Sequence, residues 1–172
     1  MNIQEIIDNY YFETLNEKHD LSDFDCGDDD LNDFLKNDAL SQQNDKLNIT
    51  KLVMYDGRIL GFSTLLTDTI FLKNIKNEKL QFKIKEKLKI NKKYKEISAV
   101  KIGRLAIRKE YIGKCLGSHI LRNIMKNLKD ISENKIGFRF IIIEGYAKAF
   151  NFYVVNNGFE YLEKDTKSIE KN

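Results

Sequence analysis

One segment of the sequence places glycines where an apolar run gives way to a helical pattern. Residues 102–118 read IGRLAIRKEYIGKCLGS, and their loop contains Gly113 and Gly117. Such a loop presents consecutive backbone N–H groups at the positive end of the following helix, which is where phosphate and pyrophosphate bind. Glycine has no Cβ, so a ligand could approach this backbone closely. The segment therefore predicts an anion-binding loop.

Two other kinds of phosphate-binding loop do not fit. A dinucleotide-binding fold needs three glycines near the first strand and an acidic residue after the second. A nucleotide P-loop ends in Gly-Lys-Ser/Thr, whereas this loop ends in Leu116-Gly117-Ser118. An ordinary strand-to-helix turn, with Gly113 and Gly117 required for packing, stays open as an alternative.

Hydrophobic patterning predicts the elements that position this loop, in one α/β domain over residues 1–172. Asp56-Gly57 joins two β-rich runs and predicts a hairpin. An apolar stripe from Leu116 to Ile131 predicts a helix, and the run Phe138–Ile143 suits a strand buried on both faces. We expect strands at 10–15, 48–55, 58–66, 97–107, 138–143 and 159–162, and helices at 30–43, 116–131 and 147–156. Residues 69–95 read as a lysine-rich insertion and 164–172 as a frayed tail.

Composition restricts the class of protein. The 172 residues are 42% hydrophobic, which is enough for a core. No apolar run approaches a membrane span, and the N-terminal residues lack the pattern of a signal peptide, so we expect a cytoplasmic protein that does not bind membranes. The two cysteines and two histidines show no metal-ligand spacing, so no metal is expected.

Charge is distributed unevenly along the chain. Residues 1–48 carry 13 Asp and Glu against 3 Lys, a net charge of −10. Residues 73–95 carry 10 Lys against 2 Glu, a net charge of +8. Such an asymmetry can steer an anionic partner such as nucleic acid toward Lys73–Lys95. The alternative is that these lysines only fill solvated positions.

Three signatures in order resemble the GNAT superfamily of N-acetyltransferases. Gly113-Lys114-Cys115-Leu116-Gly117 resembles its acyl-CoA pyrophosphate loop, although Ile112 replaces the usual Gln or Arg and Cys115 the central Gly. Ala149 to Phe159 resembles its Ala…Phe-Tyr…Gly-Phe signature. Phe24-Asp25-Cys26-Gly27 and Gly103–Ile107 resemble segments of the branch that includes tRNA-acetylating toxins. The resemblance implies a mixed central sheet of about six to seven strands flanked by helices.

The resemblance also implies roles for individual residues. Tyr153 would be the general acid that protonates the departing CoA thiolate. Ile112 would keep its backbone N–H, and Cys115 would be tolerated in a right-handed helical conformation, provided that its position does not need a positive φ, at some cost in CoA affinity. Cys115 as a reactive nucleophile is an open alternative. The cofactor-binding residues would be Leu105, Ala106, Ile107, Ile112, Gly113, Lys114, Cys115, Leu116, Gly117 and Ser118.

The resemblance implies direct acetyl transfer from acetyl-CoA to a primary amine in a ternary complex. No general base is evident: Lys101 stands where some relatives have a glutamate, and Glu96 and Glu144 carry no distinguishing pattern. The branch resemblance and Lys73–Lys95 favour aminoacyl-tRNA as acceptor. The acidic residues 1–48 favour a protein or small amine instead. A degenerate acyl-CoA-binding module without catalysis and a homodimer are further possibilities that the sequence leaves open.

Overall fold

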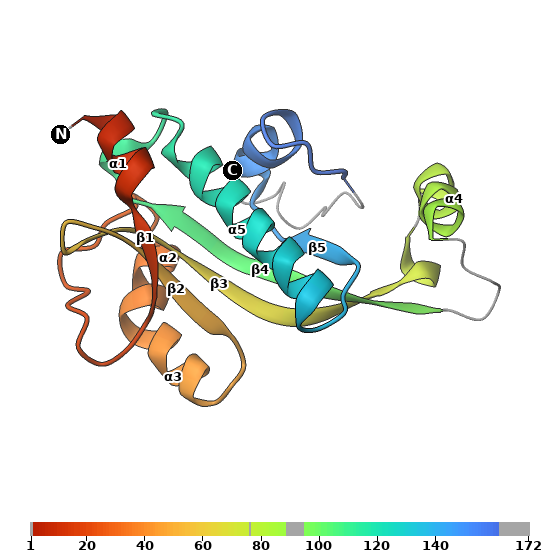
Figure 1. Cartoon of the computed structure of the whole chain (residues 1–172), viewed down its shortest axis with the longest axis horizontal. Helices are drawn as coiled ribbons and strands as arrows, with labels where there is room; N and C mark the ends of the chain where they lie inside the picture. Colours follow the sequence, from red (N-terminus) through yellow and green to blue (C-terminus); the bar gives the residue numbers. More distant parts are fainter. Residues whose placement is uncertain (1, 76, 89–94, 162–172) are drawn as a thin grey trace.

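A computed structural model describes residues 2–75, 77–88 and 95–161. Its five strands form one mixed sheet in the order β1-β2-β3-β4-β5 (Figure 1). Neighbouring strands from β1 to β4 are antiparallel, whereas β5 runs parallel to β4. The strands are β1 Tyr11–Thr14, β2 Ile49–Tyr55, β3 Arg58–Phe71, β4 Glu96–Ile107 and β5 Phe140–Ile143.

Helices cover both faces of this sheet. The α-helices are α1 Ile3–Asn9, α2 Asp29–Asp33, α3 Ala39–Asn44, α4 Glu78–Lys87 and α5 Leu116–Asn134. Shorter helical turns are η1 Phe34–Asp38, η2 Leu72–Asn74, η3 Lys109–Tyr111, η4 Ala147–Ala149 and η5 Asn151–Val155. The α/β fold class predicted from the patterning is confirmed.

β4 contributes side chains to both faces of the sheet. Successive side chains of a strand point in opposite directions, and an extra residue at Gly103 shifts this alternation, so Ile102 and Ala106 face opposite ways. Ile102 packs in one hydrophobic cluster with α1 and with the buried stripe of α5. Ala106 packs on the opposite face with Phe34 and Leu35 of η1, and Ala99 packs with α4 in a third cluster. Helices α2 and α3 therefore cover one end of that second face, and α4 covers the other end (Figure 1).

The expected hairpin and long helix are confirmed. β2 pairs with β3 through a turn in which Asp56 and Gly57 have φ values of 47° and 70°. Two positive φ values match the twist of the flanking strands, and this explains the Asp-Gly pair. In α5, the residues that face the sheet follow the predicted stripe and are buried: Leu116, Ile120, Leu121, Ile124 and Leu128.

Several predicted boundaries were wrong. The sheet has five strands in the described residues rather than six to seven, because residues 159–161 form no strand there. The helix expected at 30–43 begins one residue earlier, at Asp29, since Asp28 is the N-cap and accepts a hydrogen bond from Leu31 N, and it is interrupted by η1. β5 pairs only with β4 in the described chain, so its residues are half-buried and not covered on both faces.

The segment 69–95 is also organised differently from the prediction. Residues up to Phe71 belong to β3, and Glu96 begins β4, so the two strands pair over eleven positions and project beyond β5. Helix α4 lies at this projecting end. The predicted tail, 164–172, lies outside the described residues. No helix in the described ranges has the length and hydropathy needed to cross a membrane.

Candidate active site

Strands β4 and β5 separate in the middle of the sheet. β5 pairs with β4 only over Ala99–Ile102, while β4 continues beside β3 to Ile107. A bulge at Gly103 marks the change, because Leu65 pairs with Ile102 and Thr64 with Arg104. Within the described residues, the β5-facing edge of β4 beyond Ile102 has no strand partner. Its backbone N–H and C=O groups can therefore bond to an extended ligand.

The predicted anion-binding loop follows the free part of β4 directly. Turn η3 leads into Gly113, which has a φ of 79°, and α5 begins at Leu116. No side chain caps the N-terminus of α5, so its first N–H groups are available to an anion. Ile112 is 62% exposed, and Lys114 is exposed with its Nζ 5.7 Å from the centre of the Tyr111 ring. These features fit a phosphate-bearing ligand.

The expected conformation of Cys115 was wrong. Cys115 has φ 63° and ψ −4°, which is left-handed rather than right-handed helical backbone. Glycine adopts this conformation freely, whereas a residue with a Cβ is strained by about 1–2 kcal/mol. This strain gives a physical reason for glycine at the same position in the family pattern. The Cys115 side chain is exposed, so the loop accommodates it by pointing it into solvent.

The side chains after Cys115 turn inward and anchor the start of α5. Leu116 is fully buried, so only its backbone could face a ligand. A Cβ on Gly117 would lie 3.4 Å from the ring of Phe152, an ordinary van der Waals distance, so the start of α5 lies directly beside η5. The Ser118 hydroxyl accepts a hydrogen bond from Asn157 Nδ2 at 3.2 Å. The loop and the segment that contains Tyr153 are thereby fixed to each other.

Tyr153 lies in a largely apolar environment. Its ring packs edge-on against Phe152 and Phe159, with centroids 4.9 and 6.1 Å away. A Cβ on Gly145 would lie 2.8 Å from the Tyr153 ring, so glycine at position 145 makes room for the ring. Burial raises the pKa of the Tyr153 phenol to about 12, and its hydroxyl makes no hydrogen bond to the described residues. Tyr153 is therefore protonated at neutral pH, as a proton donor must be.

An acidic loop joins the two sides of the strand separation. Asp23 Oδ1 accepts from Arg108 Nη2 at 2.6 Å, and Asp25 Oδ2 lies 2.6 Å from Lys109 Nζ. These bonds hold the loop against the end of β4. We call residues 23–30 the acidic strap, because their other end reaches the segment after β5.

The second attachment of the acidic strap is to residues 146–148. Lys148 Nζ donates to Asp28 Oδ2 at 2.7 Å, and the hydroxyl of Tyr146 lies 3.5 Å from Asp30 Oδ2. The ammonium of Lys148 lowers the pKa of Asp28, and the ammonium of Lys109 lowers that of Asp25. Carboxylates that the sequence presents as a free acidic region are thus engaged within the molecule.

A charged cluster that the sequence did not reveal lies at the strand separation. Lys101 Nζ lies 2.6 Å from Glu144 Oε1 and 3.8 Å from Asp68 Oδ2. Lys101 is on β4, Asp68 is on β3, and Glu144 directly follows β5. Glu144 remains 73% exposed and precedes Gly145, the residue that touches Tyr153. The cluster thus places a solvent-accessible carboxylate one residue before the glycine that packs against the Tyr153 ring.

The predicted site residues gather in one region. Leu105, Ile107, Leu116 and Tyr153 pack in a single hydrophobic cluster, and Ala106 packs on the opposite face of β4. The exposed loop residues Ile112–Cys115 lie at one end of this region. The described residues contain no group of three His, Cys, Asp or Glu side chains arranged to hold a metal ion.

Comparison with solved structures identifies this arrangement, although no family model and no curated protein matches the chain. A structure of AtaT complexed with acetyl-methionyl-tRNAfMet has a TM-score of 0.75 and 27% identity, covering 94% of this chain and 98% of that one. AtaTR bound with AcCoA has a TM-score of 0.72 and 26% identity, covering 95% and 97%. The chain is an N-acetyltransferase of the GNAT fold. It resembles the branch of tRNA-acetylating toxins.

A mutant of KacT shares the fold of this N-acetyltransferase, with a TM-score of 0.74, 24% identity and coverage of 94% and 97%. The coverage is nearly complete in both directions, so the likeness extends from the acidic strap to the segment that contains Tyr153.

Proposed function

We propose that this N-acetyltransferase transfers the acetyl group of acetyl-CoA to the amino group of aminoacyl-tRNA. Acetyl-CoA supplies an activated thioester. The observation that carries the proposal is the separation of β4 from β5, with the N-terminus of α5 at one end and Tyr153 beside it. The free backbone of Leu105–Ile107 would bind the pantetheine amides, and the loop Ile112–Ser118 the pyrophosphate.

Tyr153 is the proposed proton donor. When the amine nitrogen forms its bond to the acetyl carbon, the carbon–sulfur bond breaks and the thiolate takes the phenol proton. The apolar surroundings of Tyr153 keep the phenol protonated until the thiolate forms beside it, and because they destabilise the phenolate they also make the phenol a weaker acid than it is in water. The ammonium that results from the attack must lose one proton, and the Glu144 carboxylate is the nearest exposed acceptor on the Lys101 side.

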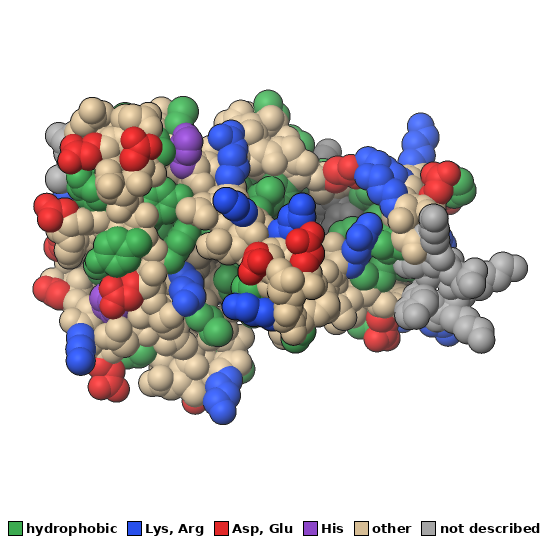
Figure 2. All heavy atoms as spheres, viewed as in Figure 1, with side chains coloured by type: hydrophobic (Ala, Val, Ile, Leu, Met, Phe, Trp, Pro, Cys, Tyr) green, Lys and Arg blue, Asp and Glu red, His purple; other side chains and the backbone are tan. Residues whose placement is uncertain are grey.

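Charge placement supports an RNA acceptor over a cationic one. Asp23, Asp25 and Asp28 of the acidic strap are paired with cations elsewhere in the chain, so they are not free to attract a lysine-rich peptide. Lysines instead gather around α4 (Figure 2). The structure of AtaT with acetyl-methionyl-tRNAfMet concerns a protein 27% identical to this chain, and it supports the same class of acceptor.

A direct assay tests the acceptor. The purified protein is incubated with radiolabelled acetyl-CoA and either charged tRNA, deacylated tRNA, a lysine peptide or spermidine. We expect label only on charged tRNA, and we expect mild alkali to release it as N-acetylamino acid because that treatment cleaves the aminoacyl ester. Label on the peptide or polyamine and none on charged tRNA would overturn the proposed acceptor.

A calorimetric titration with acetyl-CoA tests the degenerate-module alternative. Micromolar binding together with turnover would exclude a module without catalysis. Binding without transfer to any of the four acceptors would favour it. The homodimer and the cytoplasmic location stay predictions.

A further inference from the structure

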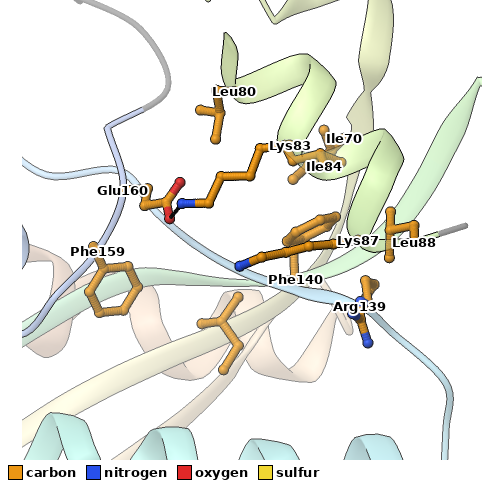
Figure 3. A pocket seen from close by; sticks show the side chains of 11 residues that line it. Ile70, Leu80, Lys83, Ile84, Lys87, Leu88, Arg139, Phe140, Phe159 and Glu160 are labelled. Atoms are coloured by element: carbon orange, nitrogen blue, oxygen red, sulfur yellow. Dashed lines mark hydrogen bonds and ion pairs between the residues drawn. The ribbon is translucent and has the colours of Figure 1, made fainter.

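A cavity outside the strand separation lies between α4 and β5. It has a volume of about 220 Å³ and opens at the projecting end of the sheet (Figure 3). Apolar side chains from four segments line it, among them Ile70 of β3, Ile84 of α4, Phe140 of β5 and Phe159. Phe140 and Phe159 are both half-buried, so part of each ring is accessible from the cavity side.

Charged side chains surround this apolar lining. Lys83 and Lys87 come from α4, Arg139 directly precedes β5, and Glu160 lies across from Lys83 (Figure 3). Lys83 forms an ion pair with Glu160. Neither Lys87 nor Arg139 has an ion-pair partner among the described residues, so three cations and one carboxylate leave two positive charges at the rim. The cavity thus combines accessible aromatic surface with uncompensated positive charge.

That combination matches one chemical class of ligand. Single-stranded nucleic acid binds where bases can stack on aromatic rings while cations hold the adjacent phosphates. We propose that this cavity binds an unpaired nucleotide of the RNA acceptor, with its base against Phe140 or Phe159 and its phosphate on Lys87 and Arg139. The inference rests on the proposed function and adds the place where the RNA is held.

The position of the cavity fits such a role. Phe140 begins β5 and Glu144 follows its end, so the two lie about 13 Å apart at roughly 3.3 Å per residue. The Phe140 end of the cavity is therefore displaced from the acetyl-transfer region, although the cavity adjoins that region through Phe159, which packs against Tyr153. A short single strand whose end lies at the acetyl-transfer region could reach it. A nucleotide held at the cavity would fix the direction from which the aminoacyl end approaches.

A matched pair of double variants tests this. Lys87→Gln with Arg139→Gln removes the two free rim charges. Lys79→Gln with Lys85→Gln removes two charges from the same helix, at residues that do not line the cavity. Both pairs are measured by fluorescence anisotropy with deacylated tRNA at several salt concentrations, and by acetyl transfer to charged tRNA and to an amino acid methyl ester.

For Lys87→Gln with Arg139→Gln, the rim pair, we expect about tenfold weaker tRNA binding. The slope of log affinity against log salt concentration should be smaller by about 1–2, because binding with fewer phosphate contacts releases fewer counterions. Transfer to the methyl ester should be unchanged, because that acceptor has no nucleotide. The control pair should change tRNA affinity by less than threefold. Equal losses for the two pairs would mean that only overall charge matters and would overturn the inference.

Phe140→Leu provides a second test that leaves charge unchanged. We expect weaker tRNA binding with an unaltered salt slope, because stacking releases no counterions. Its melting temperature is measured alongside, and unchanged tRNA binding in the folded variant would exclude stacking on this ring. Binding of an acidic peptide, with no tRNA binding at all, would reassign the cavity to a protein partner.

The test separates this inference from the proposed function. If charged tRNA is not acetylated but the rim pair still lowers tRNA affinity and its salt slope, the acceptor is wrong and the cavity inference stands. If charged tRNA is acetylated with equal efficiency by wild type and the rim pair, the function stands and the cavity inference fails.

Discussion

The strand separation and the α4 end differ in what their sequences encode. At the strand separation, chemistry depends on backbone conformation: the free edge of β4, the uncapped N-terminus of α5 and the room left by Gly145. At the α4 end, it depends on side chains that lie beside each other, namely lysines and aromatic rings. Backbone sites require particular residues at particular positions and leave motifs. On a side-chain surface, residues of the same type can occupy different positions, so the sequence shows only an enrichment in those residue types.

Loss of the Tyr153 hydroxyl should have the largest effect on activity. It should lower catalysis at the strand separation without changing tRNA binding at the α4 end. For Tyr153→Phe we expect kcat on charged tRNA to fall by about 10²–10⁴-fold, the usual contribution of a proton donor. Steady-state kinetics measures this, with calorimetry for acetyl-CoA and anisotropy for tRNA. Both affinities should be unchanged, because the variant keeps the ring and leaves α4 untouched. A loss below threefold would remove Tyr153 from the mechanism.

Relief of backbone strain in the loop should have an intermediate effect. Cys115→Gly should raise the free energy of unfolding by about 1 kcal/mol, since glycine adopts a φ of 63° without strain. Chemical denaturation measures the change. Gly113→Ala is the opposite control. Gly113 has a φ of 79° and open space beside it, so any loss of stability in the alanine variant reflects backbone conformation alone. A stability gain in the alanine variant would contradict the assigned conformations.

Alkaline pH should give the smallest effect. Burial raises the pKa of Tyr153 to about 12, above the value near 10 of an unfolded chain. The stability that the neutral phenol contributes is complete below pH 10 and is lost as pH rises toward 12, because only the unfolded chain can ionise in that interval. The stability difference between wild type and Tyr153→Phe should therefore be constant at neutral pH and decline above pH 10. A decline that begins at pH 8 would contradict a buried phenol.

What could be predicted from the sequence follows the same division. The long helix α5, the hairpin at Asp56-Gly57 and the loop at Gly113 all depend on local patterns, and the structure contains each of them. The left-handed Cys115 was missed because its residue type argues against that conformation. Helix α1 was also missed, although Asn2 caps it by accepting from Gln4 N.

Pairings between distant segments could not be read from the sequence. Lys101 meets Glu144 only because β5 lies parallel to β4 in one register. Arg108 is 3% exposed and bonds to Asp23, 85 positions away in the chain. Hydrophobic periodicity does not predict such a contact, because the contact is fixed by the packing of the whole sheet. The assignment of individual catalytic and cofactor-binding residues stays a prediction.

The acidic strap has a consequence for when this protein can act during its own synthesis. Asp28 is held by Lys148, 120 positions later, and the segment that contains Tyr153 follows Lys148. While the chain is still growing on a ribosome, β1 to β4 can pair before that partner has emerged. The strap is then without its second attachment, and the phenol is not yet made. Under the proposed mechanism, a nascent chain thus cannot acetylate anything near the ribosome until the segment that contains Tyr153 has been added.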